Sequence, residues 1–196
     1  MSEKKLYILR IEKEFKNLIR PLKREEYIQL EDNILNEGCR DPIVVWHYTI
    51  VDGHNRYEIC KRHKIPFAIM EMEFECKEAA IAWICANQLG RRSITDETRK
   101  FLIGMQYESE KIVHAKKNAD GINQHSAANL KGQSAKQVQQ PAPTGHMTAQ
   151  KIAEENHISP GTVQKYAVYT RALEQIGSKA PTLVPKILSG EYKISH

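Results

Sequence analysis

Hydrophobic side chains recur along the first 116 residues with two different periods. Between Arg24 and Asn36 they lie three or four positions apart, which predicts an amphipathic helix, and Gly38 just beyond it is a suitable C-cap. Short apolar runs predict strands at residues 6–11, 42–46, 49–51 and 67–72, and the helical period returns after Gly53, over residues 77–89 and over residues 96–114. Thr95 is a good N-cap for the last of these helices. Strands mixed with helices around a small sheet indicate the α+β class.

This periodicity is lost between residues 117 and 146. The segment is rich in Gln, Asn, Ser and Gly and contains no Phe, Trp or Tyr. Such a composition does not bury enough apolar surface to order a chain. We therefore expect a flexible linker at 117–146 that separates a domain at 1–116 from a second domain at 147–196. A long insertion within a single domain is the alternative.

The helical pattern of the last segment has the spacing of a helix-turn-helix. Thr148 is a suitable N-cap for a helix running through Glu155, and His157 falls in the turn, where glycine is usual and where histidine tolerates positive φ better than most residues. Ser159 and Pro160 are typical of the cap and the first position of a second helix. A plain helical hairpin is the alternative interpretation. A short helix over residues 181–188, interrupted by a proline, is predicted to follow.

If the second helix enters the major groove of DNA, its exposed or N-terminal residues are the candidate contacts. Gln164 can pair with the edge of an adenine, while Lys165 and Thr162 suit phosphates. We predict that five residues contact DNA: Ser159, Gly161, Thr162, Gln164 and Lys165.

Charge distribution agrees with a polyanion partner at the C-terminal end. Residues 1–114 carry equal numbers of basic and acidic side chains, so the net charge of +5 belongs entirely to residues 115–196. The hydrophobic content of 41% is that of a globular protein, and neither a membrane span nor a signal peptide is expected. The four cysteines have no metal-ligand spacing. They predict buried free thiols in a reducing cytoplasm, with no disulfide and no metal site.

The turn after the third predicted strand can bind an anion. A chain that leaves a strand at Gly53 and opens a helix directs several backbone N–H groups at one point, near the positive end of the helix dipole. Asn55 and Arg56 lie in the first turn of that helix and could close over the same anion. Many Asp-Gly turns of this kind exist for steric reasons alone, so these residues by themselves leave both interpretations open.

Together these motifs resemble the ParB family of plasmid and chromosome partition proteins over nearly the whole chain. The markers are Asp41-Pro42-Ile43-Val44-Val45, Asp52-Gly53-His54-Asn55-Arg56-Tyr57 and the run from Asn87 to Thr95. The resemblance implies a ParB/sulfiredoxin-like N-terminal domain, with a small mixed sheet and packed helices, linked to an all-α helix-turn-helix domain. It also implies a cytidine nucleotide whose phosphates are held by a Gly-Glu-Arg-Arg box and a later Glu-Asn-x-x-Arg box, and which gates a clamp on DNA.

Carried over residue by residue, the resemblance predicts a nucleotide site. It consists of Gly53, His54, Asn55, Arg56, Gln88, Arg91 and Arg92. His54 stands where the ParB box has Glu, and Asn55 where it has Arg. The Asp-Gly-His-x-Arg form is similar to the box of free serine kinases, which share the fold and use an adenine nucleotide, whereas the nucleophilic cysteine of sulfiredoxins is absent at His54.

Several roles stay open at this site. His54 is a candidate general base or nucleotide contact, or else a donor to a backbone carbonyl. Asp52 is a candidate catalytic residue as a ligand of Mg²⁺ beside a triphosphate, or else accepts a turn-stabilising hydrogen bond. Arg91 and Arg92 bind phosphate or form a solvated helix end.

From the resemblance we expect a DNA-binding, ParB-like protein of plasmid or chromosome partition, or of mobile-element regulation. Its N-terminal domain is expected to bind CTP or ATP with Mg²⁺ and so modulate DNA association, with nucleoside triphosphatase activity left open. The expected partners are double-stranded DNA, a ParA-like ATPase and a second copy of the chain, in the cytoplasm at the nucleoid. The end of the chain soon after the helix-turn-helix favours a plasmid, phage or mobile-element relative. The alternative is a small-molecule kinase or NTPase with an accessory DNA-binding domain.

Overall fold

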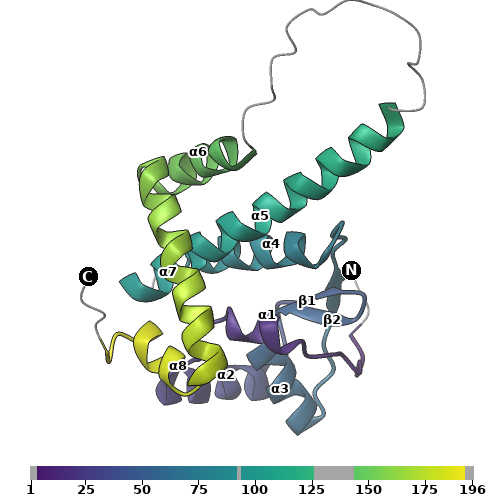
Figure 1. Ribbon diagram of the computed structural model, residues 1–196. Coiled ribbons are helices and arrows are strands. Elements are labelled where there is room, and N and C mark those ends of the chain that lie inside the picture. The colour runs from purple at the N-terminus through teal and green to yellow at the C-terminus, as the bar shows by residue number, and fades with distance from the viewer. Residues whose placement is uncertain (1–3, 92–93, 126–143, 193–196) are drawn as a thin grey trace, which may run out of the picture. The chain divides into compact units, whose positions relative to one another are not determined.

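The computed structural model describes residues 4–91, 94–125 and 144–192 (Figure 1). The contacts within the chain divide it into two compact units, residues 1–80 and residues 81–196, which we call unit 1 and unit 2. Each unit is described by itself below. The predicted domains, 1–116 and 147–196, have different boundaries from these units and stay a prediction.

Unit 1 is built around a three-stranded mixed sheet with the order β2-β1-β3. β1 (Ile43–Trp46) pairs antiparallel with β2 (Thr49–Asp52) and parallel with β3 (Ile69–Glu71). His47 and Tyr48 both have positive φ in the two-residue connection between β1 and β2, as a tight hairpin turn requires. The sequence predicted all three strands, although β3 is shorter than the expected run of residues 67–72.

Helices pack on this sheet to complete the core of unit 1. These are α1 (Lys13–Asn17), α2 (Arg24–Glu37) and α3 (His54–His63), and α4 (Lys77–Leu89) begins in unit 1 and continues into unit 2. The core joins apolar side chains from the sheet, α2 and α3, among them Ile43, Val45, Ile50, Ile59 and Phe67. The predicted helices at 24–36, after Gly53 and at 77–89 are all present, and Gly38 ends α2 with φ of +74°.

The opening of the chain differs from the prediction. Residues 6–11 were expected to form a strand, but only two isolated bridges occur, from Lys5 to Phe67 and from Arg10 to Thr49. Between them the backbone N–H of Leu9 donates to the hydroxyl of Tyr57 at 3.1 Å. Because this side chain takes the place of a ladder partner, the segment is extended without being a strand.

Unit 2 is all-helical over the residues that the structure describes. It contains most of α4, then α5 (Asp96–His125), α6 (Thr144–Asn156), α7 (Pro160–Lys179) and α8 (Leu183–Leu188). α5, α6 and α7 share one apolar core, to which they contribute Ile103, Tyr107, Ala149, Ile152, Ala153, Val163 and Ala167. Thr95 caps α5 as predicted, accepting from the N–H of Thr98 at 3.1 Å. In Figure 1, α7 crosses α5 and continues from α6.

Two predicted boundaries in this region were wrong. The helix expected to end near His114 continues as α5 to His125, and residues 126–143 of the predicted linker lie outside the described residues. The helix expected to begin after Thr148 begins at Thr144 instead, and Thr148 is buried inside it. In the described parts of the chain no helix has both the length and the apolar composition that crossing a membrane requires.

Together these elements form the α+β fold that the sequence predicted, a small mixed sheet with many packed helices.

Candidate functional site

Gly53 links β2 to α3 in a left-handed conformation that suits glycine. Its φ is +93°, and it is the N-cap of α3 without offering a side chain to the first helical N–H groups. The first turn of α3 contains no acidic residue that would offset the helix dipole. The backbone N–H groups of His54, Asn55 and Arg56 therefore open the helix without a side-chain cap, the arrangement that favours an anion.

The guanidinium of Arg56 folds back over this helix start. A Cβ added at Gly53 would lie 3.0 Å from an Arg56 Nη2, so the close approach depends on glycine. Nη2 pairs with the Asp52 carboxylate at 3.0 Å, and Nη1 with the Asp41 carboxylate at 3.4 Å. The side chain of Asp52 is 13% exposed and that of Asp41 is 82% exposed. Asp41 is thus a solvent-facing partner that an incoming anion can replace at low cost.

His54 lies beneath this turn and is only 5% exposed. Neither ring nitrogen has a hydrogen-bond partner among the described residues. Burial lowers the pKa of His54 to about 4, opposed by the Asp52 carboxylate and supported by the ammonium of Lys16. The imidazole is therefore neutral at pH 7. In this conformation it is too buried to contact a substrate, so the structure favours neither a general base nor a nucleotide contact, and among the described residues the ring donates to no backbone carbonyl.

The second group of predicted nucleotide residues lies at the end of α4, in unit 2. Gln88 is 1% exposed, and its amide nitrogen and oxygen have no partner in the described part of the chain. Arg91 is exposed, and its backbone N–H donates to the Gln88 carbonyl at 3.1 Å. Arg92 lies outside the described residues. Leaving both ends of a buried amide unpaired costs about 1–3 kcal/mol per group, but Gln88, like His54, is too buried in this conformation to contact a ligand.

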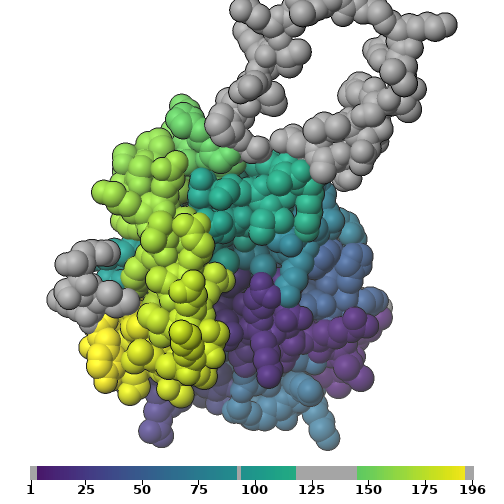
Figure 2. Space-filling view, viewed as in Figure 1, coloured from purple at the N-terminus to yellow at the C-terminus, as the bar shows by residue number. Residues whose placement is uncertain are grey.

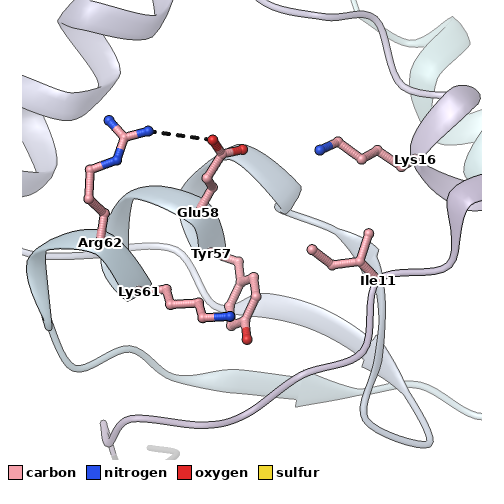
Figure 3. Close-up of a pocket in the computed structure, with 6 residues that line it drawn as sticks. All are labelled: Ile11, Lys16, Tyr57, Glu58, Lys61 and Arg62. Atoms are coloured by element: carbon pink, nitrogen blue, oxygen red, sulfur yellow. Dashed lines mark hydrogen bonds and ion pairs between the residues drawn. The ribbon is translucent and has the colours of Figure 1, made fainter.

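A cavity of about 560 Å³ runs along α3 but is distinct from the predicted nucleotide residues. Figure 3 shows Lys16 extending from α1 toward Glu58 of α3, with Ile11 below it and the Tyr57 ring beside Lys61. Lys61 and Arg62 add two further cations, and Arg62 is paired with Glu58 at 3.5 Å and with Glu31 at 3.2 Å. The cations that line it are thus partly neutralised.

The four cysteines are unpaired, and three of them are buried. A hydrogen bond with Cys60 lowers the pKa of the Cys39 thiol to about 7. Burial raises the pKa of Cys85, which keeps that thiol protonated. Among the described residues no group of three or more His, Cys, Asp or Glu side chains is placed to hold a metal ion.

The turn between α6 and α7 is a Schellman motif with histidine in the place of glycine. His157 has φ of +55°, and its N–H donates to the Glu154 carbonyl at 3.4 Å. The N–H of Ile158 donates to the Ala153 carbonyl at 3.0 Å. Ser159 then caps α7 by accepting from the N–H of Thr162 at 3.1 Å. The sequence predicted both the positive φ and the serine cap.

One face of α7 is left open after this turn. Gly161, Gln164 and Lys165 are exposed, and Thr162 is half-buried. No hydrogen bond or ion pair ties the side chain of Gln164 or Lys165 to another described residue. Figure 2 shows the segment from α6 into α7, in light green and yellow-green, at the surface. The hydroxyls of Ser159 and Thr162 bond to each other at 2.8 Å and are thus occupied within the cap.

Comparison with known proteins places this architecture among ParB N-domains. One solved structure, the C222₁ form of a Pnob8-like ParB N-domain, matches with a TM-score of 0.55 over 88% of this chain and 71% of that chain, at 16% identity. A second, the pNOB8-like ParB N-domain, matches with a TM-score of 0.53 over 90% and 68% of the two chains, at 19% identity. The chain therefore has a ParB-like N-domain fold. No protein-family model matches the sequence, and no curated protein does.

The structure brings the predicted residues together in three places. Asp52, Gly53, His54, Asn55 and Arg56 form one group at the start of α3. Gln88 and Arg91 lie at the end of α4, and the five predicted DNA contacts lie at the start of α7. No role was predicted for Asp41, because its link to Arg56 joins residues fifteen positions apart through the hairpin rather than through a helical or strand spacing.

Proposed function

We propose that this chain is a DNA-binding protein of the partition type whose N-terminal domain binds a nucleotide that modulates its association with DNA. The observation that carries the proposal is the open face at the start of α7. Gln164 and Lys165 are exposed and unpaired there, directly after a tight turn and a capped helix start. This is the arrangement with which a recognition helix enters the major groove.

The charges around this face support a polyanion rather than an acidic protein surface. Lys165 has no carboxylate partner among the described residues, whereas Arg171 and Lys151 are paired with Glu108 and Glu110. A free cation contributes to phosphate binding by releasing counterions, while a paired cation contributes less. Lys165 is therefore the residue of α7 on which DNA affinity should depend most.

The test is a fluorescence anisotropy titration of the full chain with labelled duplex DNA over a range of salt concentrations. We expect Lys165→Ala to weaken binding to all sequences and to reduce the slope of log K against log salt by about 1. Lys179→Ala, at the far end of α7, is the matched control and should leave both unchanged. Unchanged affinity and slope in Lys165→Ala would contradict the proposed DNA interface.

The nucleotide part of the proposal depends on the start of α3. The uncapped N–H groups after Gly53 and the Arg56 guanidinium offer donors and positive charge to phosphates, and the exposed Asp41 is a carboxylate that phosphate oxygens can replace. These residues fit a triphosphate. Asp52 is already paired with Arg56, so Mg²⁺ would enter bound to the phosphates.

Asp41→Asn tests this replacement without removing a phosphate donor. Because the neutral amide no longer competes for Arg56, we expect nucleotide affinity to rise by a few-fold, measured by calorimetric titration at constant Mg²⁺. Glu58→Gln is the control, since Glu58 contacts Arg62 instead of Arg56. Lower affinity in Asp41→Asn would show that the carboxylate itself holds the nucleotide or its metal.

The small-molecule kinase or NTPase remains the alternative, with Asp52 or His54 as its catalytic residue. It requires Mg²⁺-dependent turnover of ATP or CTP, with or without free serine, in the absence of DNA. The burial of His54 gives this alternative no support. A ParA-like ATPase partner and a homodimer also stay part of the proposal.

A further inference from the structure

An apolar side chain lies on the open face of α7 beyond the predicted DNA contacts. Val168 is 59% exposed, although the other valine of α7, Val163, is 0% exposed and packs in the core of unit 2. Val168 follows Gln164 by four residues and Lys165 by three. These spacings put all three side chains on one face of the helix.

Beyond Val168, side chains of α7 are bonded to α5. The guanidinium of Arg171, three residues beyond Val168, is held by the Glu108 carboxylate of α5 at 2.5 Å. The hydroxyl of Tyr169 is likewise held by the Glu97 carboxylate at 2.5 Å. Val168 is therefore the last side chain of this face before the helix is tied back to α5.

Only one group on the edges of DNA bases suits such a side chain. In the major groove, hydrogen-bond donors and acceptors mark every base pair, and the C5 methyl of thymine is the one apolar group. Gln164 and Val168 are about 6 Å apart along the helix axis, which corresponds to roughly two base-pair steps. Gln164 pairs best with an adenine edge, so the two side chains together select A·T pairs.

We propose that Val168 reads a thymine methyl group in the major groove, and that the DNA target of this protein contains A·T pairs read by Gln164 and Val168. This inference rests on the proposed DNA-binding function and names the class of sequence that the same face of α7 selects. Val168 acts as a specificity residue, whereas Lys165 supplies affinity that is independent of sequence.

The experiment uses the full chain and a duplex selected by it from a random library. Each thymine of that duplex is replaced in turn by uracil, which lacks only the methyl group, and affinities are measured by anisotropy. We expect one or two replacements to weaken wild-type binding about four-fold, the effect of one buried methyl group. Val168→Ala should bind the thymine and uracil duplexes equally at those positions.

Met147→Ala is the matched control, because Met147 is an equally prominent apolar side chain of unit 2, 66% exposed on α6. It should keep the wild-type discrimination between thymine and uracil. Circular dichroism of both variants shows whether they fold, and substitution of either exposed side chain should leave the melting temperature nearly unchanged.

Three results would overturn the inference while leaving DNA binding intact. The wild type could show no penalty for any uracil, Val168→Ala could keep the full penalty, or Val168→Ala could weaken all duplexes equally. In each of these cases Lys165→Ala still reduces affinity and the salt slope. If the full chain selects and binds no duplex, and Lys165→Ala changes nothing, then the proposed function fails and this inference fails with it.

Discussion

Gly53 adopts a left-handed conformation and also lies against the Arg56 guanidinium of the candidate nucleotide site. Alanine there must adopt a left-handed conformation, which costs about 1–2 kcal/mol, and its Cβ, 3.0 Å from Arg56 Nη2, must also shift the guanidinium that pairs with Asp52. Gly38→Ala is the matched control, because Gly38 has φ of +74° and nothing within 4 Å of an added Cβ. Urea denaturation should give a larger loss of stability for Gly53→Ala than for Gly38→Ala.

The larger loss of stability in Gly53→Ala is caused by the contact with Arg56 if it disappears when the Arg56 side chain is removed. In an Arg56→Ala background, Gly53→Ala should cost no more than Gly38→Ala does in the wild type. Equal costs of the two glycine substitutions in the wild-type background would show that Arg56 moves aside freely.

His54 predicts a specific pH dependence of stability. Its pKa in the folded state is about 4, below the ordinary value of 6.5, so the unfolded chain binds the proton more tightly. The stabilising contribution is complete above pH 6.5 and is lost as the pH falls toward 4. We expect the free energy of unfolding of the wild type to fall by up to about 3 kcal/mol more than that of His54→Gln over this window. Parallel curves for the two proteins would contradict the burial of a neutral imidazole.

At this scale, prediction succeeded where the chemistry is local. The turn at Gly53 and the cap at Ser159 each depend on residues within a few positions, and the structure has both. His157 was expected to adopt positive φ and does so. The pairing of Arg56 with Asp41 and the unpaired state of Gln88 depend on tertiary placement, which no spacing in the sequence reports.

At the scale of elements, the crossing of α5 and α7 depends on Gly104. A Cβ at this position would lie 2.3 Å from the Thr170 hydroxyl and 2.3 Å from the Tyr166 carbonyl oxygen of α7. The same crossing contains a hydrogen bond from the Thr170 hydroxyl to the Phe101 carbonyl at 3.0 Å. Gly104→Ala must separate the two helices, because a backbone atom cannot move aside as a flexible side chain does.

We expect Gly104→Ala to destabilise the protein by about 1–3 kcal/mol in spite of the higher helix propensity of alanine. Gly177→Ala is the control within α7, where the nearest atom to an added Cβ is a Val184 methyl at 3.4 Å. That substitution should be neutral or stabilising by up to about 1 kcal/mol. Thermal unfolding of both variants measures the difference, and a stable Gly104→Ala would contradict the close crossing.

Helices long enough for their apolar positions to repeat were predicted from the sequence, and shorter elements were not. α2, α4 and α7 each extend over three or more turns, so their apolar positions repeat. α1 has only five residues and offers one buried side chain, Phe15, which sets no period. The short apolar run at residues 6–11 indicated a strand, but the Tyr57 hydroxyl accepts the backbone N–H of Leu9 where a strand would have a ladder partner.

On the scale of the whole molecule, the fold was predicted and the function remains a proposal. The resemblance in the motifs around Gly53 and Gly90 led to a ParB-like N-domain, and the structural matches have that fold. The end of α5 was harder to predict, because the hydrophobic period is lost after residue 117 although the helix continues to His125. The predicted domains at 1–116 and 147–196 stay a prediction.

This proposal assigns two coupled properties to one chain, nucleotide binding at the start of α3 and DNA binding at the start of α7. Both are measured by calorimetric titration of the full-length protein with CTP and then ATP, each with Mg²⁺ and with or without duplex DNA. We predict that CTP binds the wild type, that duplex DNA changes its affinity, and that Arg56→Ala abolishes nucleotide binding while still binding DNA as the wild type does. Binding of neither nucleotide, or unchanged nucleotide affinity in Arg56→Ala, would contradict the account.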